Sequence, residues 1–390
     1  MPSVNSKPFP IQKLPELAFE AVVRQISTRE RLSLTLTSKK TLNLLLALKF
    51  PKDQAHTIHF EKDSYGFMAL IIVKDHGVEK AHKIHFGCDF YKRGRKIEWA
   101  DNVFEDWSAV SGSYVEKAQS AYRKIRKLFP ACELTLRFVN SQPEDVLQIL
   151  NAPEFKTWNE VNVYESMTPE AIKLIVDKAS LQRRIICHSS HELPRDFYHP
   201  KAFDFKVAQY SRAKWATVGQ LLSIRGVEMI GLGQTSLRSG DVRVVLKKML
   251  ETDYEMCGRL EISVTGGYDQ EEVMGDTLRF SVWNGEESTT FATTVVQMNT
   301  KIAEIHVFRN LVRICMSSNE DDHKEARRML TNLRNIIRID NAMEGAEPGE
   351  KRRLQMERDY FNGDLQDALN AFMENRRRHI GNFEFPRLFI

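Results

Sequence analysis

The chain has 390 residues, of which 42% are hydrophobic and 28% are charged, and its formal net charge is +4. This is the composition of an average globular protein, so it excludes a disordered or fibrous chain, and so small a net charge gives no reason by itself to expect nucleic-acid binding. A chain of this length predicts two or three domains, each with its own core.

The five cysteines occur singly, without a C-x-x-C pair. This pattern disfavours a zinc finger or a disulfide scaffold and favours a reducing compartment. Met1 to Pro10 contains no apolar signal segment, and the densest apolar run, Leu42 to Phe50, is too short to span a bilayer. We therefore expect an intracellular protein, cytoplasmic and/or nuclear, with no membrane segment and no cofactor.

The first fifty residues predict three short helices. The first starts at Pro15, because proline suits the first position of a helix. Ser27 and Glu30 have the spacing of a capping box for a second helix, and Ser38 can cap a third that ends before Pro51. These helices carry more Leu, Val and Phe than so small a unit can bury by itself. Either they form a cap that docks on the rest of the chain, or they offer an apolar face to a second protein.

Three ordered pieces of this segment form a motif: Phe9-Pro10-Ile11, Leu14-Pro15 and Leu32-Ser33-Leu34-Thr35-Leu36-Thr37-Ser38-Lys39-Lys40. Together they resemble the F-box of the nematode-type F-box family, which reads approximately F-P-I-x-x-L-P, a helix, and L-x-x-L-S-L-x-S-K/R. The resemblance covers residues 7–50 and implies a three-helix module that docks on the Skp-type adaptor of a cullin–RING ubiquitin ligase. Eight positions are the candidate adaptor-binding residues: Pro10, Leu14, Pro15, Leu17, Val23, Ile26, Leu32 and Leu34.

Residues 52–128 predict antiparallel strands and a connecting helix over 114–128. The strands are indicated by runs of β-branched and aromatic residues between charged turns, at 57–60, 67–73 and 83–86. His56-x-x-His59 has a spacing that a metal site could use on a helix. On a strand, however, residues three apart point to opposite faces, so we expect no metal here.

From residue 129 to 316, strands and helices alternate at irregular intervals. This periodicity predicts a leucine-rich-repeat-like β–α arc, although a doubly wound α/β sheet has similar spacing. The strands are expected at 133–138, 158–164, 184–188, 203–207, 227–230 and 260–264, with helices at 215–224 and 241–250. Gly231 and Gly233 follow a strand as in a dinucleotide-binding fingerprint, but Ser236 replaces the third glycine and the next helix starts too late. We interpret this segment as a plain turn.

Three segments in the second half of this region also form a pattern: Trp215 to Leu222, Leu237 to Met249, and Leu260 to Val264. They resemble the nematode-type F-box-associated domain (type 2), with its W-x-x-x-x-x-L-L, L-T-D-x-D-L-N-x-F-L-K-x-W and L-E-x-L-x-I segments. Arg243 replaces the usual Asn, and Met249 replaces the usual Trp. The resemblance implies that residues 129–316 receive a target protein, which the sequence does not identify.

The end of the chain predicts more antiparallel strands and then charged helices. The strands are expected at 277–283, 291–298, 302–308 and 312–316. In the segment 317–390, helices are expected over 321–338 and 351–378, joined by the Gly/Pro/Glu-rich 344–350. Acids are interleaved between the basic triplets at 351–353 and 376–378, so we interpret these as a solvated helix face rather than as a nuclear import signal or a nucleic-acid patch.

The sequence contains no nucleophile elbow, P-loop, zinc-protease motif or kinase motif. It predicts an α+β protein in which a three-helix F-box precedes an irregular leucine-rich-repeat-like β–α body with antiparallel strands and C-terminal helices. The predicted function is a non-enzymatic substrate-recognition adaptor of a cullin–RING (SCF-type) ubiquitin ligase. The alternatives are a non-catalytic interaction scaffold, a weakly basic nucleic-acid-binding protein, and an enzyme whose site is built from residues distant in sequence.

Overall fold

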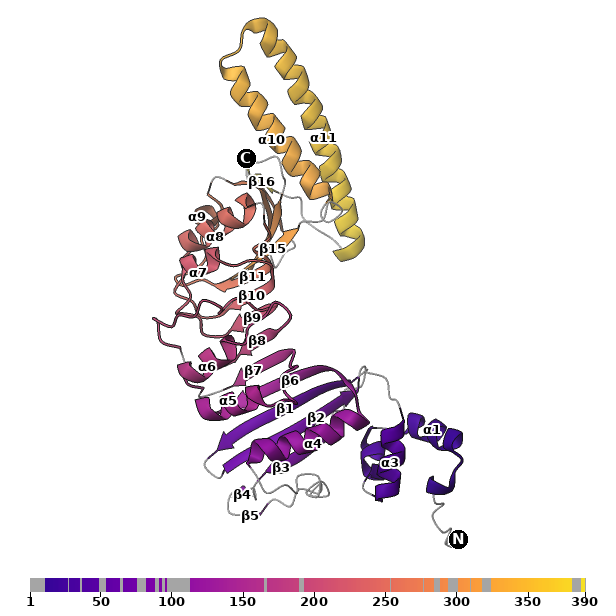
Figure 1. Cartoon of the computed structure of the whole chain (residues 1–390). Helices are drawn as coiled ribbons and strands as arrows, with labels where there is room; N and C mark the ends of the chain where they lie inside the picture. Colours follow the sequence, from indigo (N-terminus) through magenta and orange to yellow (C-terminus); the bar gives the residue numbers. More distant parts are fainter. Residues whose placement is uncertain are drawn as a thin grey trace. The chain divides into compact units, whose positions relative to one another are not determined.

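The chain, described here by a computed structural model, divides into two compact units. Unit 1 is Met1–Ile175 and unit 2 is Val176–Ile390. Helices and strands occur in both units (Figure 1), so the fold is mixed α/β. The structure describes residues 11–26, 28–35, 37–48, 54–63, 66–75, 82–87, 91–92, 95–96, 113–164, 167–188, 193–252, 254–275, 277–283, 288–293, 301–308, 310–317, 324–380 and 387–389.

Unit 1 begins with short helices. A 3-10 turn at Ile11–Lys13 leads into α1 (Glu16–Gln25), α2 (Thr28–Thr35) and α3 (Lys39–Ala47). α1 starts at Glu16, one residue later than predicted, so Pro15 is the residue that caps the helix rather than its first helical residue. Ser27 and Pro51, which the sequence assigned to a cap and a helix end, lie outside the described residues.

The sheet of unit 1 has the strand order β3-β2-β1-β6-β7. β1 (Gln54–Asp63), β2 (Gly66–Asp75) and β3 (His82–Gly87) form an antiparallel meander, as the three β-type runs predicted. β6 (Ala131–Val139) runs parallel to β1, and β7 (Glu160–Tyr164) runs parallel to β6. The meander and the β–α region therefore share one sheet in this unit. β4 (Tyr91–Lys92) and β5 (Arg95–Lys96) form a separate small hairpin.

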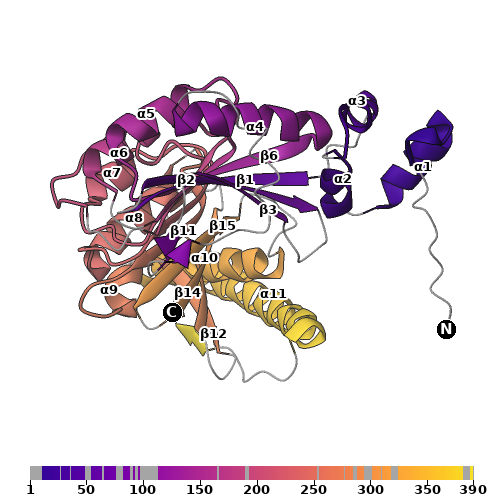
Figure 2. The same ribbon diagram turned by 90° about the horizontal axis from the view of Figure 1, so that it is seen from below.

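One face of this sheet is covered by helices. Figure 2 shows α4 (Tyr114–Leu128) and α5 (Pro143–Asn151) along that face, and α6 (Pro169–Val176) follows β7. α4 starts with a capping box: the Ser113 hydroxyl accepts from the Glu116 amide at 3.3 Å, and the Glu116 carboxylate accepts from the Ser113 amide at 2.8 Å. The core lies between helices and strands, where Ile58, Phe60, Tyr122, Ile125, Leu136 and Phe138 are fully buried.

Unit 2 contains the rest of the β–α alternation, as the periodicity predicted. Its first strands, β8 (Arg184–Cys187), β9 (Val207–Tyr210), β10 (Val227–Leu232) and β11 (Cys257–Ser263), are parallel neighbours. α7 (Val218–Leu222) connects β9 to β10, and α8 (Ser239–Glu251) connects β10 to β11.

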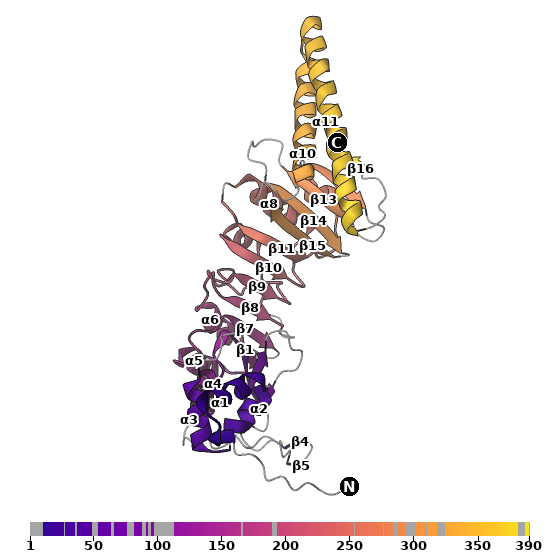
Figure 3. The same cartoon turned by 90° about the vertical axis from the view of Figure 1, so that its right-hand side faces the viewer.

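The sheet of unit 2 continues as antiparallel strands in the order β11-β15-β14-β13-β12-β16. Their bounds, with the preceding α9, are α9 (Gln270–Met274), β12 (Leu278–Trp283), β13 (Ser288–Thr293), β14 (Ile302–Phe308), β15 (Leu311–Ser317) and β16 (Arg387–Phe389). α10 (Lys324–Glu344) and α11 (Pro348–Ile380) lie side by side (Figure 3) and share a core with Phe280 and Phe291.

Two expected elements in unit 2 differ from the structure. The strand expected over 203–207 starts only at Val207 and runs to Tyr210. The helix expected over 215–224 is reduced to the five residues of α7, and Trp215 lies in the turn before it. Part of the strand expected over 291–298 lies outside the described residues, because β13 is described only as far as Thr293.

Candidate interaction site

The three N-terminal helices are held by local hydrogen bonds and a contact with the sheet-bearing part of unit 1. The Ser38 hydroxyl accepts from the Thr41 amide at 3.1 Å, which confirms the cap predicted for α3. Between α1 and α2, the Arg31 guanidinium donates to the Ile26 carbonyl at 3.1 Å. The same guanidinium lies 5.9 Å from the centre of the Phe129 ring, at the end of α4. The helices are thus anchored to the sheet-bearing part of the same unit.

The structure separates the candidate adaptor-binding residues by burial. Val23 is fully buried, so it stabilises the interior and offers no surface to a partner; it is removed from the candidate surface. Leu17 is 81% exposed. Of the others, Pro15 is exposed, Leu14, Ile26 and Leu34 are half-buried, and Pro10 and the side chain of Leu32 lie outside the described residues.

α1 is apolar on two sides. Phe19 and Val23, one helical turn apart, are buried on one side. Leu17 and Ala21 are also one helical turn apart, and both are exposed. They lie on the opposite side of the helix from Phe19 and Val23, because successive residues turn by about 100°. Val22 is also exposed. One row of α1 therefore fills the interior, and a second apolar row faces outward.

A charged pair flanks the outward row. The Arg24 guanidinium and the Glu20 carboxylate, four residues apart, form an ion pair at 2.6 Å. Such an exposed pair contributes little to stability. It does place a polar border beside the apolar row, which is the usual arrangement of an interface core and its rim.

α3 shows the same division less strongly. Thr41 and Leu45 are buried, whereas Leu46 is exposed and Leu42, one turn before it, is half-buried. The sequence reasoning did not include Val22 and Leu46 among the candidates. The signal that could have found them is the set of apolar positions that remain after one buried stripe per helix has been assigned.

We name the exposed apolar residues of α1, Leu17, Ala21 and Val22, the N-terminal apolar surface. Its chemistry is limited to burying hydrocarbon, since it contains no titratable or metal-binding group. Within the described part of the chain, no group of three or more His, Cys, Asp or Glu residues could hold a metal ion. His56 and His59 lie on β1 and differ in burial, in agreement with the prediction that they point to opposite faces of a strand.

Two of the described cysteines, Cys187 and Cys257, have the properties of structural thiols. Cys187 and Cys257 are buried, and burial raises the pKa of each thiol to about 12. Both thiols are therefore protonated at neutral pH, whereas a nucleophilic cysteine acts as the thiolate.

Comparison with protein families, curated proteins and solved structures finds no match to this chain. Among the described residues, no helix is both long enough and apolar enough to cross a bilayer.

Proposed function

We propose that this protein is a substrate-recognition subunit of a cullin–RING ubiquitin ligase. In this proposal, the three N-terminal helices bind a Skp-type adaptor and the β–α body binds a target protein. The observation that carries the proposal is the 81% exposure of Leu17 on a helix whose other apolar row is already buried. The ordered F-box-like motif of residues 7–50 supports the choice of partner.

The energetics favour a protein partner for this surface. Fully burying a leucine side chain contributes about 1.5–3 kcal/mol, and burial of the exposed Val22 on the same helix can add to it. Phe19 and Val23 already fill the interior side of α1, so Leu17 is not needed there. An apolar row with a polar border, on a short helix, is the feature by which helices dock into grooves of other proteins.

The β–α body suits the role of target binding. In unit 1, α4 and α5 lie along one face of the sheet (Figure 2). In β11 of unit 2, Leu260 and Ile262 are buried while Arg259 and Glu261 on the other face are half-buried. A doubly wound sheet is covered by helices on both faces, so the half-buried face of β11 supports a leucine-rich-repeat-like arrangement for the parallel strands. The antiparallel strands differ, because Phe280 and Phe291 share a core with α10 and α11.

The proposal gives this chain no catalytic step. The other subunits of the ligase would carry out the transfer of ubiquitin, and this chain would hold the target near them. The protonated state of the buried Cys187 and Cys257 thiols is consistent with a binding role, because neither thiol is poised to accept ubiquitin as a thioester.

The test is the capture of a purified Skp-type adaptor by the full chain. Wild type should bind, and Leu17→Glu should weaken binding by about 30-fold or more, since an interface anchor contributes about 2 kcal/mol and the carboxylate would have to be desolvated. Leu17→Ala should give an intermediate loss. Leu181→Glu is the matched control, because Leu181 is also an exposed leucine but belongs to unit 2.

Each variant should keep the thermal midpoint of wild type, since the replaced side chains are exposed. If Leu17→Glu binds the adaptor as well as Leu181→Glu does, the N-terminal apolar surface is not the docking surface. If the folded wild-type chain does not bind the adaptor at all, the proposed function is wrong.

A further inference from the structure

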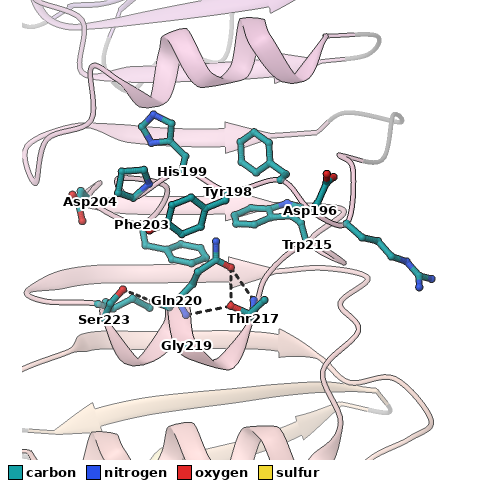
Figure 4. A pocket seen from close by; sticks show the side chains of 14 residues that line it. Asp196, Tyr198, His199, Phe203, Asp204, Trp215, Thr217, Gly219, Gln220 and Ser223 are labelled. Atoms are coloured by element: carbon teal, nitrogen blue, oxygen red, sulfur yellow. Dashed lines mark hydrogen bonds between the residues drawn. The ribbon is translucent and has the colours of Figure 1, made fainter.

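Unit 2 contains a cavity of about 430 Å³ that the proposed function does not yet use. It lies between the connection that follows β8 and the helix α7 (Figure 4). This volume is within the range of about 300–1,000 Å³ that ligand pockets occupy. The cavity is lined on one side by residues 195–200 and 203–204, and on the other by Trp215 and residues of α7 and its ends.

An aromatic cluster forms the floor of the cavity. Trp215 is buried and stacks on Phe203, with ring centres 5.6 Å apart. Phe197 and Tyr210 each contact the indole edge-on at 5.1 Å. The Tyr210 hydroxyl donates to the Ala202 carbonyl at 2.7 Å. These ring contacts hold the connection against the indole, and they make the floor rigid.

The α7 side of the cavity is held by the helix cap. The Thr217 hydroxyl accepts from the Gln220 amide at 3.3 Å, and the Gln220 side-chain carbonyl accepts from the Thr217 amide at 2.9 Å. On the opposite side, His199 accepts from the Lys201 amide at 3.2 Å through Nδ1, and its Nε2 lies 3.1 Å from the Asp177 carboxylate. Both walls are therefore fixed by hydrogen bonds before any ligand binds.

Several groups at the cavity have no partner in the described part of the chain. The carboxylates of Asp196 and Asp204 form no ion pair, and Figure 4 shows them at opposite ends of the cavity. Tyr198 is 64% exposed, so its ring is accessible to a ligand at the cavity. The buried Trp215 Nε1–H has no acceptor. A pocket that combines aromatic rings with unpaired carboxylates is suited to a cation.

We propose that this cavity binds a basic segment of a target protein, with a lysine or arginine side chain placed against the aromatic rings and attracted by Asp196 and Asp204. Arg195 also lines the cavity, so the lining carboxylates outnumber the lining guanidinium two to one. The same charges repel phosphate and so disfavour nucleic acid as the occupant. That the occupant is a target protein rests on the proposed function. That the cavity favours a basic side chain does not depend on it.

The experiment measures the binding of fluorescein-labelled peptides to the full chain by fluorescence polarisation. The four probes have the sequence Gly-Ser-X-Leu-X-Ser-Gly, where X is Arg, Lys, Gln or Glu. The Arg and Lys probes should bind at least about 10-fold more tightly than the Gln probe, and about 300 mM salt should weaken them by screening. The Glu probe should bind more weakly than the Gln probe.

Variants locate the binding within the cavity. Asp204→Asn, Asp196→Asn and Tyr198→Ala should each weaken the Arg probe about 3- to 10-fold, as expected for the loss of one contact to a cation. Asp367→Asn is the matched control, because it makes the same change of charge on an exposed side chain of α11. It should leave probe binding unchanged. All four positions are exposed, and an unaltered thermal midpoint checks that each variant is folded.

Three results would overturn the inference. The first is equal binding of the Arg and Gln probes, and the second is absence of binding by both basic probes at millimolar concentration. The third is an equal loss in Asp204→Asn and Asp367→Asn, which would mean attraction by net charge alone. Adaptor capture is measured on the same preparations, so failure of the peptide test and failure of the proposed ligase role are distinguishable.

Discussion

At the scale of single residues, His56 is the most unusual side chain in unit 1. It is fully buried on β1, and its ring contacts Tyr122 edge-on at 5.7 Å. Neither ring nitrogen has a hydrogen-bond partner in the described part of the chain. Burial, and secondarily the nearby Arg126, lowers the pKa of His56 to about 4. The imidazole is therefore neutral in the folded protein at physiological pH.

This burial predicts a loss of stability in mild acid. The unfolded chain protonates His56 near pH 6.5, while the folded chain takes up that proton only near pH 4. Between these two values the unfolded state binds more protons, so the free energy of unfolding falls as the pH falls, by up to about 1.4 kcal/mol per pH unit. The pKa of His59 is lowered as well, chiefly by burial, so it acts in the same direction.

Thermal midpoints measured from pH 7 down to pH 4 check this. His56→Phe retains the ring contact with Tyr122 but cannot take up a proton, so its midpoint should fall less steeply with pH than that of wild type. His199→Gln is the control for the loss of a histidine in general, because its imidazole has a carboxylate partner in Asp177 and is not an isolated buried ring. If the thermal midpoint of His56→Phe falls with pH as steeply as that of wild type, protonation of His56 is not the cause of the loss of stability in acid.

At the scale of elements, the clearest failure of sequence reasoning is the strand expected over 203–207. Phe203 and Phe205 alternate with Asp204 and Lys206, which is the pattern of a half-buried strand. The structure shows that both phenylalanines are buried from a connecting segment instead, with Phe203 stacked on Trp215. An alternation of apolar and polar residues indicates only which side chains are buried. A connecting segment that packs on an aromatic cluster can have the same alternation as a strand.

The long C-terminal helices were easier to predict, because their apolar residues recur at a helical period over many turns. What the sequence did not show is the polar contact that fixes one helix against the other. Asp364 of α11 accepts from Arg328 Nε at 3.0 Å and from Asn332 Nδ2 at 2.6 Å, both on α10. Asn332 is buried, so its amide depends on this carboxylate for a hydrogen bond.

Removing that acceptor should destabilise the helix pair. Asp364→Ala leaves the Asn332 amide buried and unsatisfied, which should cost about 1–3 kcal/mol and lower the thermal midpoint. Asp367→Ala, one turn away and exposed, should change it little. Asp364→Asn keeps an acceptor and should recover part of the loss. If Asp364→Ala and Asp367→Ala melt alike, the polar contact does not stabilise the pair.

At the scale of the whole molecule, sequence patterns predicted which segments form helices and strands better than they predicted which strands pair with one another. The parallel pairing of β1 with β6 joins residues almost eighty positions apart, such as Phe60 and Phe138. β11 pairs with β15, where Leu260 lies opposite Ile314, rather than with β12, the next strand along the chain. Such pairings depend on how several elements bury one another, and no local period encodes them. The same limit applies to the candidate site: the composition of α1 indicated surplus apolar surface, but only the structure separates Leu17 from Val23.

The two proposed binding sites lie in different compact units, which predicts that they act independently. The N-terminal apolar surface belongs to unit 1 and the aromatic cavity belongs to unit 2, and no residue is shared between them. Leu17→Glu should therefore weaken adaptor binding about 30-fold while leaving binding of the Arg probe unchanged. Tyr198→Ala should weaken binding of the Arg probe about 3- to 10-fold while leaving adaptor binding unchanged. In the double variant the two losses should match those of the single variants within about 0.5 kcal/mol, as expected for sites that share no residue. Isothermal titration of all four proteins with the adaptor and with the probe measures both affinities, and a coupling above that value would mean that adaptor binding alters the target site.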